Sequence, residues 1–123
     1  MKTKSQVEDT LSKEITRFYV TNIGTGPKET RVYVIHDMVI VRLKGRLLPI
    51  EEKILKAHQG IELVKNLRKT LHEVTVEGLQ DIITSVTGCK VISAHSDVST
   101  RTGERIEVYV LEDDLEGRLL KRL

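Results

Sequence analysis

The fold is decided by residues 31–43, which read RVYVIHDMVIVRL. β-Branched residues crowd both sides of the short polar break His36-Asp37, and this pattern is typical of a β-hairpin. Apolar residues fall on both parities of each arm. We therefore expect both faces of these strands to be covered, either by helices or by a partner chain.

A second and longer hairpin is predicted towards the C-terminus. Residues 90–98 are extended in pattern, residues 99–104 form a hydroxyl-rich turn, and residues 105–111 return as a second strand. Glycine at position 103 suits the positive φ that such a turn needs.

The faces of these two strands follow from the alternation of side chains along extended backbone. On the return strand, one face is wholly apolar and the other is mixed, and we expect the apolar side of the sheet to lie under helices. The alternating residues are Ile106, Val108 and Val110 against Glu107 and Tyr109. On the outgoing strand, one face is expected to hold Val91, Ser93, His95 and Asp97.

Helical periodicity fills the rest of the chain. Residues 7–22 carry apolar side chains at steps of three and four, and Gly24 stands where a left-handed helix end belongs. A second apolar stripe runs through residues 50–86 with interruptions at Gly60 and Gly78, and it predicts one kinked helix, two helices or three.

A short helix is expected to follow the acidic residues 112–114. The element order is then helix, hairpin, one or more helices, hairpin, helix. Two hairpins joined into a four-stranded antiparallel sheet, with helices packed on one face, form the simplest two-layer arrangement. The sequence thus predicts an α+β fold in a single domain over residues 1–123.

The composition of the chain limits the classes of function that it can have. The chain has 123 residues and a formal net charge of +2, from 20 Lys and Arg against 18 Asp and Glu, which does not point to nucleic acid. Cys89 is the single cysteine, so no intramolecular disulfide can form, in keeping with a reducing cytoplasm. No apolar run approaches the roughly 20 residues that cross a bilayer. We expect a cytoplasmic domain without direct membrane insertion.

Several stretches together resemble one bacterial family of small proteins, the MpsC-like family. It is named after a sodium-translocating system that generates a membrane potential. The resemblance implies a soluble accessory component beside membrane subunits that move the ion. Leu48 departs from the Thr expected before Pro49, so the helix there should lack a side-chain cap. The matching stretches are GTGPKETR at 24–31, VIVRLKG at 39–45, LPIEE at 48–52, TGCKV at 87–91 and HSDVSTRTGER at 95–105.

The glycine-rich stretch around Gly26 is the first candidate site. Backbone N–H groups beside Lys28 and Arg31 suit a phosphate, a carboxylate or carbonate, although a helix end followed by a tight turn explains the same residues. Arg31 and Arg42 flank the first hairpin and are either an anion clamp or two solvated strand ends.

The second hairpin carries the other candidates. His95 and Asp97 share a face and suit a common ligand, but a metal ion needs a third ligand, and we expect none to be bound. Arg101, Thr102 and Glu104 lie in the turn, where they either contact a ligand or partner or are solvated.

No catalytic arrangement emerges from the sequence, because Cys89 has no neighbouring base and no nucleophile elbow is present. We therefore expect neither catalytic residues nor a cofactor. The leading hypothesis is a non-enzymatic accessory or regulatory protein that forms a homodimer or docks on a membrane protein partner of an ion-translocating system. The alternative is a small-anion or metabolite sensor, whose site would combine Gly26, Lys28, Arg31, Arg42, His95 and Asp97.

Overall fold

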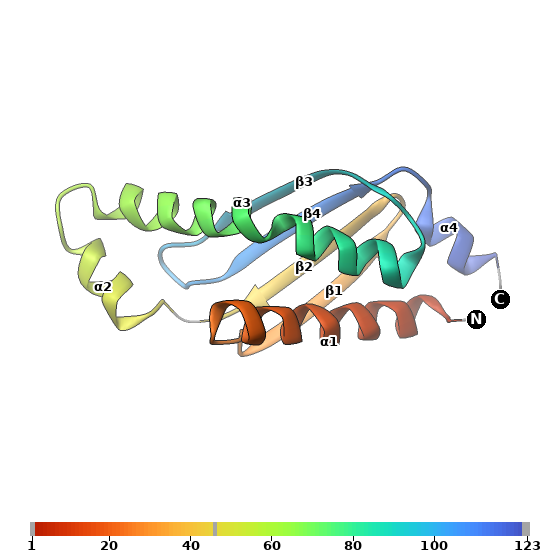
Figure 1. The fold of residues 1–123 in the computed structure, drawn as a ribbon, viewed down its shortest axis with the longest axis horizontal. Helices are drawn as coiled ribbons and strands as arrows, with labels where there is room; N and C mark the ends of the chain where they lie inside the picture. Colours follow the sequence, from red (N-terminus) through yellow and green to blue (C-terminus); the bar gives the residue numbers. More distant parts are fainter. Residues whose placement is uncertain (1, 46, 122–123) are drawn as a thin grey trace.

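The computed structural model describes residues 2–45 and 47–121 of the chain (Figure 1). Four helices and a four-stranded sheet follow one another in the predicted order. In chain order the elements are α1 (Lys4–Ile23), β1 (Glu29–Ile35), β2 (Met38–Lys44), α2 (Pro49–Leu55), α3 (Gly60–Thr87), β3 (Val91–Val98), β4 (Arg105–Leu111) and α4 (Leu115–Leu120).

The sheet joins the two hairpins side by side in the order β1-β2-β4-β3, with every pair antiparallel. The hairpins β1-β2 and β3-β4 meet through β2 and β4, so β1 and β3 are the edge strands. The predicted α+β class and element order are confirmed. The strand order was not determined by the sequence, because either strand of each hairpin can face the other hairpin.

Helix α1 begins and ends as its sequence predicts. Thr3 and Gln6 form a reciprocal capping box at its start, and Gly24 ends it in the left-handed region with φ of 91°. One stripe of the helix faces the sheet and is buried. It consists of Val7, Leu11, Ile15 and Tyr19.

The long helical pattern of residues 50–86 forms two helices, α2 and α3. A corner separates them at Gly60, whereas Gly78 lies inside α3, where a Cβ atom would come within 2.6 Å of the Phe18 ring on α1. Gly78 therefore serves close packing between α1 and α3 and does not end a helix. Leu48 caps α2 without a side-chain acceptor, as expected, and its N–H donates to Glu51 at 2.8 Å.

Helices α1 and α3 lie on one face of the sheet (Figure 1). The core fills the space between these helices and the sheet, and α4 closes one end of it. Its fully buried side chains include Leu11, Ile15, Val34, Val39, Val41, Leu79, Ile83 and Tyr109. None of the helices in the described residues is both long enough and apolar enough to cross a bilayer.

Strand β4 is oriented opposite to our expectation. Its buried positions are Arg105, Glu107, Tyr109 and Leu111, so the mixed face of the strand lies under the helices. The wholly apolar face, with Ile106, Val108 and Val110, points away from them and is only half-buried. The reason is that Glu107 and Arg105 find polar partners beneath the helices, which the sequence did not reveal.

A second correction concerns the start of β3. The register shifts between Val91 and Ser93, so that Val91 pairs with Leu111 and packs on the core. Ser93, His95 and Asp97 share the opposite face as expected, but Val91 does not belong with them. One extra residue in a strand reverses the alternation of side chains beyond it.

Candidate functional site

The face of the sheet turned away from α1 and α3 is the most apolar exposed surface of the strands. We call it the open sheet face. The pairing registers order its side chains into rows across the four strands. The rows are Ile35-Met38-Val110-Ser93, then Tyr33-Ile40-Val108-His95, then Arg31-Arg42-Ile106-Asp97. Seven of these twelve side chains are apolar or aromatic, and the charged ones gather in the last row.

That charged row has one cation, Arg31, at one edge of the sheet and its anion, Asp97, at the other, with Arg42 on the central strand β2. Arg31 lies on edge strand β1 and pairs with Glu29, and Arg42 beside it donates to Glu104 at 2.8 Å. Asp97 lies on edge strand β3, where its carboxylate is 79% exposed. Exposed pairs of this kind add little to stability, so these side chains remain available to a partner.

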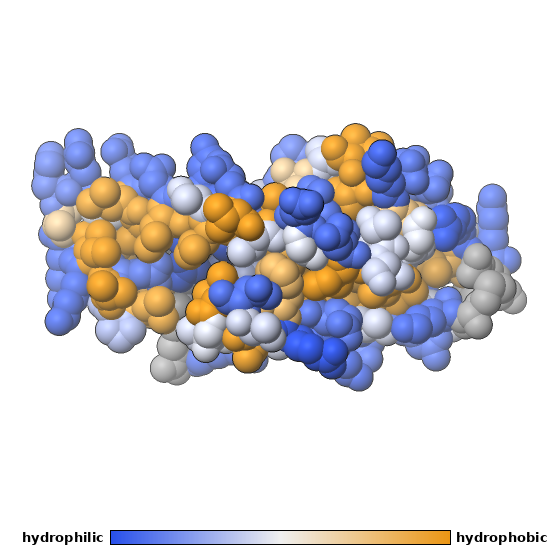
Figure 2. Space-filling view, in the orientation of Figure 1, coloured by the Kyte–Doolittle hydropathy of each residue, from blue (hydrophilic) through white to orange (hydrophobic). Residues whose placement is uncertain are grey.

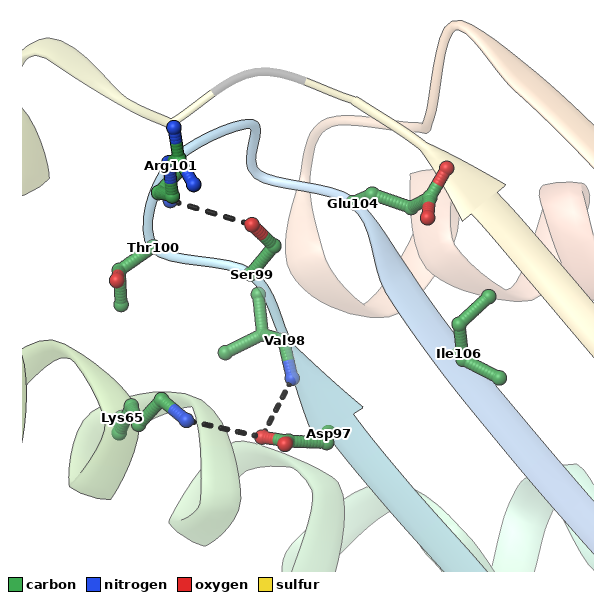
Figure 3. Close-up of a pocket in the computed structure, with 8 residues that line it drawn as sticks. All are labelled: Lys65, Asp97, Val98, Ser99, Thr100, Arg101, Glu104 and Ile106. Carbon is green, nitrogen blue, oxygen red and sulfur yellow. Dashed lines mark hydrogen bonds and ion pairs between the residues drawn. The ribbon is translucent and has the colours of Figure 1, made fainter.

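A shallow cavity of about 390 Å³ lies beside the β3-β4 turn (Figure 3). Lys65 reaches from α3 to within 3.6 Å of Asp97, and Arg101 and Glu104 complete the rim. The hydroxyl of Ser99 accepts hydrogen bonds from the backbone N–H groups of residues 101 and 102, each at 3.2 Å. These are the bonds of an ordinary hydrogen-bonded turn.

A larger cavity, of about 650 Å³, opens on the helical side between the end of α1, α2 and the first half of α3. We call it the helical groove. Its rim holds exposed apolar side chains, among them Ile23, Leu48 and Leu67. Its polar lining includes Arg68 and Arg105. Figure 2 shows hydrophobic residues gathered over α2 and the first half of α3.

A buried polar network adjoins the helical groove and shares Tyr19 and Arg105 with its lining. Glu107 is fully buried on β4 and accepts hydrogen bonds from the hydroxyls of Tyr19 and Tyr109, the latter at 2.8 Å. Arg105 lies 3.3 Å from the same carboxylate. The His72 Nδ1 atom lies 3.6 Å from Glu107, too far for a hydrogen bond, and finds no partner among the described residues.

A second ion pair continues this network towards the solvent. Arg68 donates two hydrogen bonds of 2.7 Å to the buried Glu51 on α2, in the bidentate geometry that makes such pairs strong. Its backbone carbonyl in turn accepts from Arg105 at 3.3 Å. The ion pair therefore connects α2 to α3, and the Arg68 carbonyl connects α3 to β4 of the sheet.

The contacts within this network determine which of its side chains are ionised. Burial opposes ionisation of Glu107, but the His72 ring, the two tyrosine hydroxyls and the charge of Arg105 outweigh it and lower the pKa of the carboxyl group. Burial, together with the Glu107 charge, raises the pKa of Tyr19 and of Tyr109. The carboxylate is therefore held ionised and the two phenols are held neutral.

Comparison with known proteins places this chain in a family. The family model described as "Na+-translocating membrane potential-generating system (MpsC)" matches residues 3–113. The chain belongs to the MpsC family. The uncharacterized protein YbcI of Bacillus subtilis (strain 168) is 42% identical over 122 residues, which cover 99% of this chain and 98% of that protein. No solved structure matches the chain.

In this MpsC-family chain, the predicted site residues fall into separate places. Gly26 and Lys28 line the helical groove. Arg31, Arg42, His95 and Asp97 lie on the open sheet face, on the other side of the sheet.

The three predicted turn residues lie at the β3-β4 turn, and one of them reaches Arg42 on β2. Glu104 meets Arg42, while Arg101 lines the shallow cavity and the Thr102 N–H bonds within the turn. Within residues 2–45 and 47–121, no group of three or more His, Cys, Asp or Glu side chains comes close enough to hold a metal ion.

Sequence reasoning missed the buried network of this MpsC-family chain. Tyr19 and Glu107 are 88 positions apart, and nothing in the local pattern connects them. The one available signal was a carboxylate in the middle of a β-branched strand, because Glu is depleted from such positions unless it is paired.

Proposed function

We propose that this MpsC-family protein is an accessory protein of a sodium-translocating membrane system and acts by protein-protein association. It binds a membrane subunit of that system from the cytoplasmic side and is itself a homodimer. The family description supports the link to ion translocation. The two apolar surfaces described above support action through association, since contiguous exposed apolar patches mark interaction sites.

One observation carries the proposal, and it concerns the first half of α3. This half extends with α2 past the end of α1 (Figure 1). Val64 is its one buried apolar side chain, whereas Ile61, Leu63, Leu67 and Val74 are all exposed. A helix normally buries its apolar stripe, so an exposed stripe that enters the groove at Leu67 suits a partner helix.

The charges around the groove favour a polypeptide partner that carries both apolar and acidic side chains. The charged lining of the groove consists of Lys28, Arg68 and Arg105 against Glu51 and Glu52, which leaves cations in excess. Cations around an apolar groove steer an acidic amphipathic segment into it and fix its direction.

The experiment measures binding of the purified protein to the detergent-solubilised membrane subunits of a sodium-translocating system of this family. Leu67→Asp places a carboxylate on the rim of the helical groove, where Leu67 is 47% exposed and its loss does not empty the core. We expect at least tenfold weaker binding, because a buried contact would then hold an unpaired charge.

Leu120→Asp is the matched control, because Leu120 is 49% exposed and lies on α4 at the other end of the molecule (Figure 1). This variant should bind as the wild type does. Equal binding by both variants, or no binding by the wild type, contradicts the proposed docking through the helical groove.

A further inference from the structure

The open sheet face carries an inference that rests on the proposed action by association and deepens it. We propose that a second copy of this chain stacks on the open sheet face, sheet against sheet, about a twofold axis parallel to the strands. The arrangement uses a surface on the opposite side of the sheet from the helical groove, so the dimer and the membrane subunit do not compete.

The orientation of β4 is the first reason. The strand turns its charged and aromatic side chains under the helices and its three β-branched side chains outwards. With Ile40 and Met38 of the neighbouring β2, these residues make an apolar strip along the two central strands, in which Arg42 lies beside Ile106. Such a strip, with polar side chains along the β3 edge and Arg31 at the β1 edge, has the composition of a protein interface core.

The position of the charges supplies the second reason and identifies the partner. Arg31 on β1 and Asp97 on β3 belong to the same row, one at each edge of the sheet. Their side chains are 57% and 79% exposed. Within the chain, Arg31 pairs with Glu29 and Asp97 lies 3.6 Å from Lys65, but exposed pairs of this kind are weak and exchange partners at little cost. A cation at one edge and an anion at the other, at the same height along the strands, make the face complementary to itself.

The symmetry follows from that placement. A twofold axis between the two sheets and parallel to the strands sets β1 of one copy over β3 of the other and β2 over β4, at unchanged height. Arg31 of each copy then faces Asp97 of the other, so that two ion pairs form at the edges. In the same row Arg42, which is paired with Glu104 of its own chain, faces Ile106. In the next two rows Ile40 faces Val108 and Met38 faces Val110.

The alternative twofold axis, across the strands, gives a worse contact. It places β1 of one copy over β1 of the other and reverses the order of the rows along the strands. Arg31 of one copy then faces Ile35 of the other. Neither Arg31 nor Asp97 would then gain an opposite charge, whereas the axis parallel to the strands gives each of them one. The charge pattern therefore selects the axis parallel to the strands, in which stacked sheets differ in direction by about 30°.

The size of the face fits a reversible dimer. Strands of seven residues extend about 23 Å, and four strands span about 19 Å, so each copy contributes about 440 Å² of flat area. Both copies together bury roughly 900 Å² of flat area, and the uneven surface of the side chains adds to this value. The total is close to the roughly 1,000 Å² of the smallest specific interfaces. We expect a dimer that dissociates on dilution.

Sedimentation equilibrium between 1 and 200 μM tests the dimer and its axis. We expect the wild type to pass from monomer to dimer over this range. Arg31→Asp and Asp97→Arg each set like charges opposite one another and should raise the dimer Kd at least tenfold. The double variant, Arg31→Asp with Asp97→Arg, restores opposite charges and should return the Kd to within threefold of the wild type.

Lys13→Asp is the control, because Lys13 lies on an exposed part of α1 and the charge change matches that of Arg31→Asp. It should dimerise as the wild type does. A wild type that stays monomeric at 200 μM overturns the proposal, as does a double variant that is no better than the single ones. Leu67→Asp should dimerise normally, so a failure of the helical groove to bind membrane subunits is distinguishable from a failure of the dimer.

Discussion

Glu107 decides which way β4 faces. Arg105 and Tyr109 share its strand face and would turn with it, but the Tyr19 hydroxyl is within its reach only beneath the helices. Turning the strand over would bury Ile106 and Val108, but it would break the contact with Tyr19 and remove Tyr109 and Leu111 from the core. In the orientation observed, the buried carboxylate keeps several hydrogen-bond partners, and losing them would be costly.

The first prediction at this scale is a pH-dependent loss of stability in Glu107→Gln. The pKa of Glu107 is lowered in the folded protein, so its contribution is present above the ordinary pKa of about 4.5 and is lost as the pH falls through the folded value. We expect the substitution to lower the free energy of unfolding by about 3 kcal/mol at pH 7 and by less at pH 3.5.

Urea unfolding of wild type and variant at the two pH values measures this difference. Glu62→Gln, on an exposed position in the first turn of α3, is the control and should change little at either pH. An equal loss of stability from Glu107→Gln at both pH values would contradict the role given to the ionised carboxylate.

At the scale of elements, the corner between α2 and α3 holds the helical groove in shape. Helix α2 packs mainly on α3, through the bidentate pair of Glu51 and Arg68. Gly60 lies where the two helices approach most closely. A Cβ atom there would come within 1.9 Å of the Ile54 carbonyl oxygen, which is backbone and cannot swing aside.

Gly60→Ala should therefore displace α2 from α3. We expect the amides of α2 to lose hydrogen-exchange protection, and the free energy of unfolding to fall by about 2 kcal/mol, in the range of overpacked sites. Gly45→Ala is the matched control, because a Cβ atom at Gly45 meets nothing within 4 Å. Full protection of α2 in Gly60→Ala would show that the corner does not depend on this close approach.

At the scale of the whole molecule, the sheet has one face under helices and one face open. The helical face contains the buried network, and the open face contains the apolar strip and the Arg31 and Asp97 edges. A fold of this shape leaves a large part of its apolar surface to be covered by a partner. Stability should then depend on protein concentration.

The melting temperature should rise by roughly 2 °C for each tenfold increase in concentration where the dimer dominates, because only the folded chain dimerises. Differential scanning calorimetry at several concentrations measures this slope. In Arg31→Asp the melting temperature should depend less on protein concentration. A wild-type melting temperature that does not change with concentration would argue against coupling between dimerisation and stability.

The sequence by itself determined the order of the elements and most of their identities, because these depend on local signals, but it left open how many helices residues 50–86 form. Helix α1 follows from its apolar period and Gly24, and both hairpins follow from their β-branched runs and turns. Family membership was also accessible, since the matching stretches span nearly the whole chain. The candidate positions His95 and Asp97 were placed correctly on one face for the same reason, since neighbours along a strand alternate regularly.

Only the tertiary structure decided which face of β4 is covered, how the hairpins adjoin and which side chains meet Glu107. Tyr19 and His72 come from α1 and α3, and no local pattern requires them to meet Glu107 on β4, whereas Arg105 shares its strand face through simple alternation. The alternation of a strand defines its two faces but not what covers each of them. That is fixed by the free energy of the whole arrangement, in which the covered face of β4 buries Tyr109 and Leu111 together with a hydrogen-bonded carboxylate.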